Sequence, residues 1–194
     1  DDEVDRAASV ALAPFSTGGS SDGPAENPYE VHAELQQSMN DLVGIIRREP
    51  EMVEALERLK VLRQRAARVV VEGHRQYNPG WHLALDLRNM LDVAECVARA
   101  ALERQESRGG HTREDFPAMD PQWRRVNLVC RKAEDGGIEL VRQPSIAMDP
   151  VLLRLFERSE LEKYLTAEEL AGLEERSTVA DDRTGGPAAP EEQA

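Results

Sequence analysis

One stretch of this 194-residue chain gathers side chains that could bind an anion or transfer a proton. It reads LERQESRGGHTREDFP, from Leu102 to Pro117, and it contains an adjacent pair of glycines. Adjacent glycines let the backbone take positive φ and come close to another surface. The guanidinium groups of Arg108 and Arg113 match carboxylates or phosphates, and His111 can donate or accept a proton near neutral pH. These three residues are the candidate site that the sequence predicts.

Two interpretations of this turn follow from its composition. In the first, the three candidates form a polar latch that closes the segment onto another domain. In the second, they cap the end of the preceding helix and form ion pairs with nearby acids, as charged helix ends commonly do. The acids available for such local pairs are Glu103, Glu106 and Asp115. Neither interpretation needs a catalytic residue, and we assign none to this chain.

A second polar cluster, GHRQYNPGW, spans residues 73–81. It combines two donors, His74 and Arg75, with two large amphipathic rings, Tyr77 and Trp81. One interpretation is a rigid connector between helices, in which Trp81 fills the end of a helical bundle. The other is a docking surface for an upstream domain or a partner subunit.

The remaining histidines and cysteines do not form a recognisable site. His32, His74 and His82 lack the i, i+4 spacing of a metal-binding helix, and no cysteine joins them at ligand spacing. Cys96 and Cys130 stand alone, which favours two buried, reduced thiols over a disulfide framework. The sequence also lacks a GxSxG elbow, a P-loop and a GxGxxG fingerprint, so we assign no metal or cofactor ligand to it.

The composition limits which classes of partner the protein can bind and in which compartment we expect it. The formal net charge is −13, which argues against a nucleic-acid partner because phosphate binding needs a basic surface. Apolar residues make up 40% of the chain, enough for one core. No run approaches the roughly 18 apolar residues of a membrane span, and no signal peptide is evident. We therefore expect a cytoplasmic protein that reaches a membrane only through partner subunits.

Three helices must position these clusters. Asn27-Pro28 begins the first, whose apolar stripe we expect to continue to Ile46. Pro50 begins the second, which ends at Gly73, and the third runs from about Gly80 to Glu106. These periods predict an up-down-up bundle with the third helix at its centre. The stripes are Val31, Leu35, Met39, Leu42 and Ile46, then Val53, Leu56, Leu59, Leu62, Ala66 and Val70, and finally Leu83, Leu87, Met90, Leu91, Ala94, Ala98 and Leu102.

Smaller elements follow the bundle. Alternation over 125–131, a turn at 135–137 and a second strand ending before Pro144 predict a β-hairpin. Asp149-Pro150 opens a short helix through Phe156, and Thr166 with Glu169 forms the capping box of another. A further weak helical stripe lies within residues 1–15.

The predicted fold class is therefore mainly α: a three-helix up-down-up bundle followed by a small β-hairpin and short C-terminal helices. We divide the chain into four parts. These are an upstream helix remnant with a flexible linker (1–27), the bundle with its polar turn (28–117), the hairpin with short helices (118–176) and a disordered tail (177–194).

The bundle and the polar turn together resemble a known family. The helix NPGWHLALDLRNMLDVAECVARAALERQ, the turn ESRGGHTREDFP and the following WRRVNLVC are similar to the C-terminal region of the flavoprotein subunit of succinate dehydrogenase and fumarate reductase. L-aspartate oxidase belongs to the same superfamily. The resemblance covers the chain from about Glu30 to about Leu165. The segment HAELQQSMNDLVGIIRREPEM looks actinobacterial and favours a dehydrogenase over an aspartate oxidase.

This resemblance implies a larger enzyme of which the chain is the C-terminal piece, an expectation that a first residue Asp1 also favours. Such an enzyme carries covalent FAD on an upstream domain and interconverts succinate and fumarate. It passes electrons to an iron–sulfur subunit, then to quinone, with membrane anchor subunits holding it at the inner face of the cell membrane. The segment alone should be inactive, because the FAD-binding and catalytic segments are absent from it.

Within such an enzyme, the role that the resemblance implies for this segment is structural. It would brace the FAD-binding and capping domains, with the latch closing onto the former, and help present them to the iron–sulfur subunit. Some apolar or basic surface, including Arg63, Arg68, Arg108 and Arg113, should then be uncovered in the isolated chain. Two alternatives stay open: a stand-alone three-helix interaction module without redox activity, and the C-terminal domain of an L-aspartate oxidase.

Overall fold

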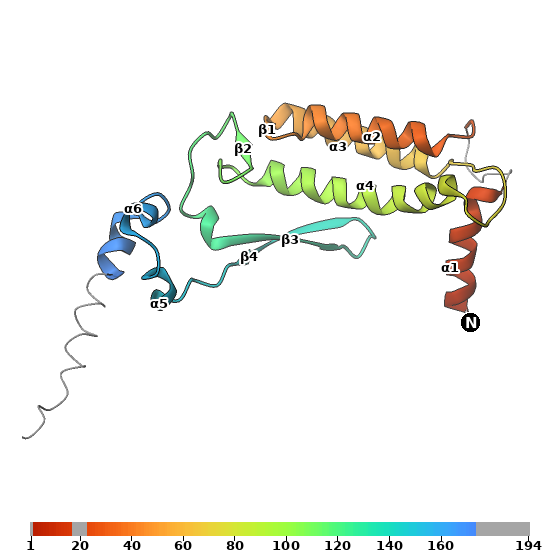
Figure 1. Cartoon of the computed structure of the whole chain (residues 1–194). Coiled ribbons are helices and arrows are strands. Elements are labelled where there is room, and N and C mark those ends of the chain that lie inside the picture. The colour runs from red at the N-terminus through yellow and green to blue at the C-terminus, as the bar shows by residue number, and fades with distance from the viewer. Residues whose placement is uncertain (1, 17–22, 174–194) are drawn as a thin grey trace, which may run out of the picture.

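The structure of the chain, a computed structural model, describes residues 2–16 and 23–173 (Figure 1). Its framework is three helices that lie side by side and run up, down and up: α2 (Pro28–Leu42), α3 (Glu49–Ala66) and α4 (Pro79–Glu103). An N-terminal helix, α1 (Asp2–Leu12), stands at one end of this bundle and continues into a 3-10 turn (Ala13–Phe15). The predicted fold class, mainly α with a small hairpin, is confirmed.

Two helices of the bundle begin where the Asn-Pro pairs predicted. Oδ1 of Asn27 accepts a hydrogen bond from the main-chain N of Tyr29 (2.9 Å), and Oδ1 of Asn78 accepts one from that of Trp81 (3.1 Å). The proline of each pair occupies the first turn, where a missing N–H sacrifices no helical hydrogen bond. These local signals fix where α2 and α4 start.

Aliphatic side chains from all three helices fill the core. Helix α4 packs against α2, against α3 and against the hairpin, as expected for the central helix. The core contains few aromatic rings, so its stability depends on close packing of aliphatic side chains. Its buried members include Val31 and Leu35 of α2, Ala55, Leu59 and Leu62 of α3, and Leu87, Leu91, Ala94 and Ala98 of α4.

All three predicted helix ends in the bundle differ from the structure, and α4 ends at Glu103 rather than at about Glu106. Helix α2 ends at Leu42, and Ile46 lies in a short strand, β1 (Ile46–Arg47), with 61% of its surface exposed. The reason is tertiary, because β1 pairs in parallel with β2 (Thr112–Arg113), which follows α4. Helix α3 ends at Ala66 rather than near residue 73, because the main chain of residues 68–70 bonds to Glu26 instead.

The buried face of α3 also differs from the predicted stripe. Met52 and Ala55 are fully buried, whereas Val53 is 45% exposed. Met52, Ala55, Leu59 and Leu62 follow one another at spacings of 3, 4 and 3, which is as good a helical face as the predicted one. The sequence offered two overlapping faces, and the position of α4 selected one of them.

The predicted hairpin is confirmed and is not isolated. Strands β3 (Val126–Lys132) and β4 (Ile138–Pro144) pair antiparallel, and Gly136 in their turn takes a φ of 85°. The hairpin runs along α4 (Figure 1) and joins the bundle through a 3-10 turn (Trp123–Arg125), whose Trp123 is buried. This packing gives a two-stranded ribbon the support that it lacks alone.

The C-terminal helices lie beyond the open end of the hairpin, opposite its turn (Figure 1). They are α5 (Pro150–Leu153), which ends three residues before the predicted Phe156, α6 (Arg158–Leu161), which was not predicted, and a helical stretch over 167–173. The capping box is confirmed: the Thr166 main-chain N donates to the Glu169 carboxylate (2.9 Å), and the Glu169 N donates to the Thr166 hydroxyl (3.3 Å).

The predicted linker is partly a structured element. Glu26 exchanges main-chain hydrogen bonds with Arg68 and Val70 (both 3.1 Å), and its carboxylate binds Arg65 (3.0 Å) and Arg68 (3.2 Å). Residues 17–22 of the linker and the predicted disordered tail, 177–194, lie outside the described residues. The division of the chain into four parts stays a prediction.

Candidate functional site

The polar turn after α4 is a tight reverse turn. It lies against the loop that connects α2 to α3. Arg108 and His111 exchange both main-chain hydrogen bonds (2.8 and 3.0 Å), and Gly109 between them takes a φ of 58°. The chain then enters β2, whose Thr112 N donates to Ile45 O (3.3 Å). Segments more than 60 residues apart thus form one site.

Arg113 is fully buried and is the centre of this site. Its Nη1 donates to three main-chain oxygens at the end of α4, those of Ala101 (3.0 Å), Leu102 (2.9 Å) and Arg104 (3.1 Å). Its Nε and Nη2 form a two-pronged pair with Asp115, both at 2.7 Å. This pairing, opposed by partial burial of the carboxyl, lowers the pKa of Asp115 to about 2. Arg113 therefore caps α4 and joins it to the following turn.

Glu106 is the second buried charge of the turn. Its carboxylate accepts from Arg104 (2.7 Å), from both prongs of Arg108 (2.9 Å each) and from the main-chain N of Asp120 (2.9 Å). Burial opposes ionisation, but these donors, Arg108 foremost, hold the pKa of Glu106 below its usual value. Glu106 and Arg108 thus satisfy each other inside the segment.

His111 bridges the turn to the loop between α2 and α3. Its Nδ1 lies 2.6 Å from Nη1 of Arg47, which can only donate, and its Nε2 lies 3.2 Å from the main-chain oxygen of Arg104, which can only accept. The ring is therefore neutral, with its proton on Nε2. Burial first, and then the charges of Arg47, Arg113 and Arg104, lower the pKa of His111.

Arg47 differs from the other arginines of the site because no carboxylate of the described residues pairs with it. Its Nε donates only to the main-chain oxygens of Gly44 (2.7 Å) and Val43 (3.4 Å), and its Nη1 meets the neutral His111. Burial and the charge of Arg113 lower the pKa of Arg47. No sequence pattern indicated this role, because His111, the partner of Arg47, lies 64 positions away.

The surface around Arg47 exposes apolar side chains and leaves open space beside two glycines. Ile45 and Ile46 are 72% and 61% exposed, and a Cβ added at Gly109 or Gly110 would meet no atom within 4 Å. Gly110 takes neither a positive φ nor a close internal contact, so the fold of this chain does not require a glycine there. We call Ile45, Ile46, Arg47, Gly109 and Gly110 the docking corner.

The contacts follow the second interpretation of the turn, that of local capping and pairing, for two of the three candidates. Arg113 pairs with Asp115 and Arg108 pairs with Glu106, whereas Glu103 pairs with Arg142 of the hairpin (2.6 Å). A latch onto another domain stays a prediction. It now applies best to His111 with Arg47, because no acid of the described residues pairs with Arg47.

The expected uncovered basic surface is reduced to Arg63, which stays exposed although its charge is paired. Arg113 is buried, and Arg63 pairs with Asp92 (2.6 Å) and Glu95 (2.9 Å) of α4. Arg68 and Arg108 are also paired, as described above. The sequence could not predict the partners of Arg63 and Arg68, because those acids lie on other elements, whereas Glu106 and Asp115 lie in the same turn as Arg108 and Arg113.

The turn over 73–81 is a connector with one projecting ring. Trp81 packs on Phe15 (ring centroids 5.4 Å apart), and its Nε1 donates to Ala11 O at 2.7 Å, which closes the end of the bundle as the connector interpretation predicts. Arg75 lies over the Phe15 ring (5.8 Å) and His74 is exposed. Tyr77 is 97% exposed at a φ of 54°, so its ring remains available for docking, which stays a prediction.

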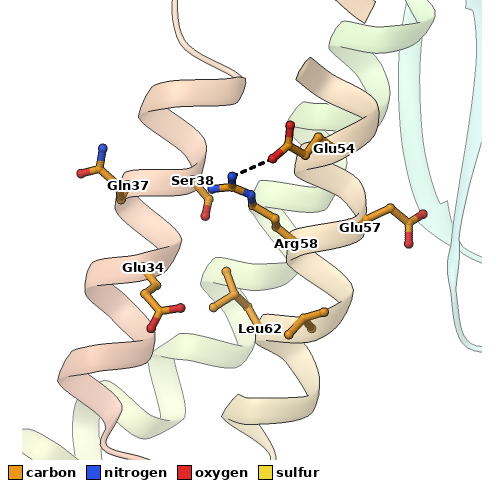
Figure 2. A pocket seen from close by; sticks show the side chains of 8 residues that line it. Glu34, Gln37, Ser38, Glu54, Glu57, Arg58 and Leu62 are labelled. Atoms are coloured by element: carbon orange, nitrogen blue, oxygen red, sulfur yellow. Dashed lines mark hydrogen bonds and ion pairs between the residues drawn. The ribbon is translucent and has the colours of Figure 1, made fainter. Parts of the chain in front are cut away.

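The groove between α2 and α3 carries no comparable chemistry. It holds about 450 Å³, and its acids are neutralised: Arg58 reaches Glu54 in Figure 2 (2.6 Å), Lys60 pairs with Glu57 and Arg65 pairs with Glu34. In the described parts of the chain, no three His, Cys, Asp or Glu side chains gather as metal ligands would. Across these same residues, no helix combines the length and apolarity that crossing a membrane requires.

The described residues do not fit a dinucleotide cradle either. Such a cradle needs a glycine-rich turn from a strand into a helix, and α3 follows β1 without one. Only one buried side-chain polar atom of the described residues, Nε of Arg68, lacks a partner, so no set of donors is left open for a pyrophosphate.

The sequence and the fold of this chain are similar to those of known proteins. The family described as fumarate reductase flavoprotein C-term matches residues 32–160. Mycobacterium smegmatis Sdh1, solved in complex with UQ1, is 56% identical and superposes with a TM-score of 0.77, covering 88% of this chain and 28% of that one.

Two curated relatives agree with this match. The fumarate reductase flavoprotein subunit of Mycobacterium tuberculosis is 32% identical over 116 residues, 59% of this chain. The succinate dehydrogenase flavoprotein subunit of Coxiella burnetii is 35% identical over 129 residues, 64% of this chain. The chain spans 20% of the length of the first of these relatives and 22% of the length of the second.

Proposed function

The chain belongs to the family of fumarate reductase flavoprotein C-terminal domains, and from this premise we propose that it serves a succinate dehydrogenase or fumarate reductase flavoprotein as its C-terminal helical domain. The observation that carries the proposal is the 56% identity and 0.77 TM-score with Sdh1 over 88% of the chain. In the proposed enzyme, succinate and fumarate are interconverted, and FAD passes the electrons to an iron–sulfur subunit, then to quinone. Anchor subunits hold the assembly at the inner face of the cell membrane.

The role of this segment in the proposal is structural. FAD would be held by an upstream domain, since the residues described here do not fit a cradle for it. The ion pairs of Arg113 with Asp115 and of Arg108 with Glu106 hold the turn rigid. In each pair one side chain is fully buried and the other is mostly shielded from solvent, which strengthens the hydrogen bonds between them. A rigid turn can present Arg47 and His111 in a fixed orientation to a neighbouring surface.

The docking corner is the surface that we assign to the flavin domain. Its two exposed isoleucines offer apolar area, and its unpaired guanidinium attracts a carboxylate. Its two glycines leave room for a backbone to approach. A partner that fits all three features is a loop of the flavin domain that carries an acidic side chain beside apolar ones.

The family-level proposal is tested on extract of the source cells. An antibody against residues 120–160 is applied to a denaturing gel that is also read for flavin fluorescence. A fluorescent band much heavier than 21.6 kDa supports a covalent flavoprotein. A heavy band without fluorescence favours the aspartate oxidase alternative, and a dark band at 21.6 kDa favours the stand-alone module.

The docking corner has its own test, in which Gly110→Leu is compared with Gly172→Leu, because both glycines face open space. In the 194-residue chain, both variants should keep their Tm within about 2 °C of the wild type. In the complete flavoprotein, only Gly110→Leu should lower flavin content and succinate oxidation. Equal flavin content and activity in the two complete variants would overturn the corner while leaving the family-level proposal intact.

A further inference from the structure

The two cysteines, which the sequence leaves as separate thiols, meet in the folded chain. Cys96 lies on α4 and Cys130 lies in the middle of β3. The Sγ of Cys130 donates a weak hydrogen bond to the main-chain oxygen of Cys96 at 3.9 Å, and both thiols are free and half-buried. The strand alternates its faces, so residue 130 points at α4 while its neighbours in sequence point away. The contact is thus built by the packing of the hairpin on the helix.

We propose that Cys96 and Cys130 form an oxidation site: a dithiol that a small two-electron oxidant of the peroxide class converts to a disulfide between α4 and β3. Half-burial admits an oxidant as small as hydrogen peroxide more readily than a bulky disulfide.

The chemistry balances with one peroxide for each pair of thiols. One thiolate attacks a peroxide oxygen, the O–O bond breaks, and the sulfur becomes a sulfenic acid as the released hydroxide takes a proton to form water. The second thiolate then attacks this sulfur and displaces hydroxide, which forms a second water. The two sulfurs together lose two electrons, and the two peroxide oxygens gain them.

The position of the bond gives it a structural consequence. It would close a loop of residues 96–130, which contains the end of α4, the whole polar turn and the buried Trp123. Oxidation would therefore fix the hairpin to the bundle and limit how far the polar turn can open. A cross-link over a loop of this length should raise the Tm of the chain by roughly 10 °C.

The environment of the thiols sets the speed of the reaction. Burial, the hydrogen bond with Cys130 and the charges of Glu95 and Asp92 raise the pKa of the Cys96 thiol. Little thiolate is then present near neutral pH, so oxidation should be slow there and should accelerate between about pH 7 and about pH 9. This behaviour suits a site that responds to sustained oxidation.

The test treats the dilute 194-residue chain with hydrogen peroxide, removes the excess with catalase and maps the tryptic peptides without reduction. We expect peptides 89–99 and 126–131, which carry the two cysteines, to appear linked. The intact mass should fall by two hydrogen atoms, both thiols should disappear together, and dithiothreitol should reverse both the mass change and the rise in Tm. The chain contains only 2 cysteines, so no other internal disulfide can produce this result.

Single variants are the matched controls. Cys96→Ser and Cys130→Ser should each retain one thiol or gain oxygen atoms, without the loss of two hydrogens. Addition of oxygen to the wild-type cysteines without a linked peptide, or a bond only between two chains, would overturn the proposal. The wild-type peptide map decides the matter even if a variant does not fold.

Discussion

At the scale of single residues, Arg113 is the side chain on which the polar turn most depends. It is fully buried, and it satisfies three carbonyl oxygens and one carboxylate at once. Removing its charge leaves Asp115 with only the main-chain N of Glu49 (3.1 Å) among the donors from other residues, and the end of α4 without its cap. Arg113→Met should lower the free energy of unfolding by about 3 kcal/mol, measured by urea denaturation. Arg88→Met, at an exposed position of α4, is the control and should change it by less than about 0.5 kcal/mol.

His111 makes the stability of the same turn depend on pH. Its pKa is lowered in the folded chain, so between its ordinary pKa and its folded pKa the unfolded chain binds the extra proton. Stability is therefore fully present above the ordinary pKa, about 6.5, and falls as the pH drops below it. A proton on Nδ1 would also break the contact with Arg47 and add a charge beside Arg104 and Arg113.

The free energy of unfolding of the wild-type chain should fall as the pH is lowered from about 7.5 to about 5.5. Urea denaturation at each pH measures it. His111→Gln should flatten that part of the curve, whereas His74→Gln, an exposed histidine of the connector, should leave it unchanged. Parallel curves for the wild type and His111→Gln would show that His111 does not carry this pH dependence.

At the scale of elements, Glu169 joins the last helical stretch to the 3-10 turn that precedes β3. Its carboxylate accepts from Arg124, from Arg125 (2.8 Å) and from the main-chain N of Thr166 (2.9 Å). The hydrogen bond from Thr166 is the largest influence that lowers the pKa of Glu169, to about 2. This one side chain both caps a helix and joins it to the 3-10 turn that precedes β3.

Glu169→Gln keeps an acceptor for the cap but removes the charge that holds both arginines. Amide exchange over residues 167–173 should become faster, measured by hydrogen–deuterium exchange. The global free energy of unfolding should change by less than about 1 kcal/mol, because the pairs are partly exposed. Glu168→Gln, at an exposed neighbouring position, is the matched control and should exchange like the wild type. Unchanged exchange in Glu169→Gln would mean that other contacts hold this stretch.

At the scale of the whole molecule, the net charge of −13 opposes compactness. Exposed ion pairs contribute little individually, so screening the overall repulsion should outweigh screening the pairs. The Tm should therefore rise by a few degrees between about 20 mM and about 200 mM NaCl. Choline chloride at equal ionic strength should produce the same rise, and a fall in Tm with both salts would show that the ion pairs dominate.

The exposed apolar residues also belong to this scale, because they separate the two main views of the chain. A stand-alone module should present a uniformly polar surface, whereas Ile45, Ile46 and Val93 are each more than 60% exposed. Ile146 and Leu155, near the C-terminal helices, are exposed to an even larger extent. This distribution favours a domain that other surfaces cover over an independent module.

The sequence by itself determined the features that depend on neighbours within a few residues. The Asn-Pro caps of α2 and α4, the turn of the hairpin and the capping box at Thr166 all have their partners within four positions. The family resemblance also came from the sequence, because the long helix, the polar turn and the first strand lie in one nearly continuous stretch, residues 78–130.

Only the tertiary structure decided which groups meet across the bundle. It moved Ile46 out of α2 into a strand, selected the buried face of α3 and placed Arg47 beside His111, 64 positions away. It also brought Cys130 to Cys96 and paired Arg63 with acids of α4. The physical reason is that a helical or alternating period specifies which face of an element is apolar. The packing of the elements then sets their rotation and register, and so determines which polar side chain faces which.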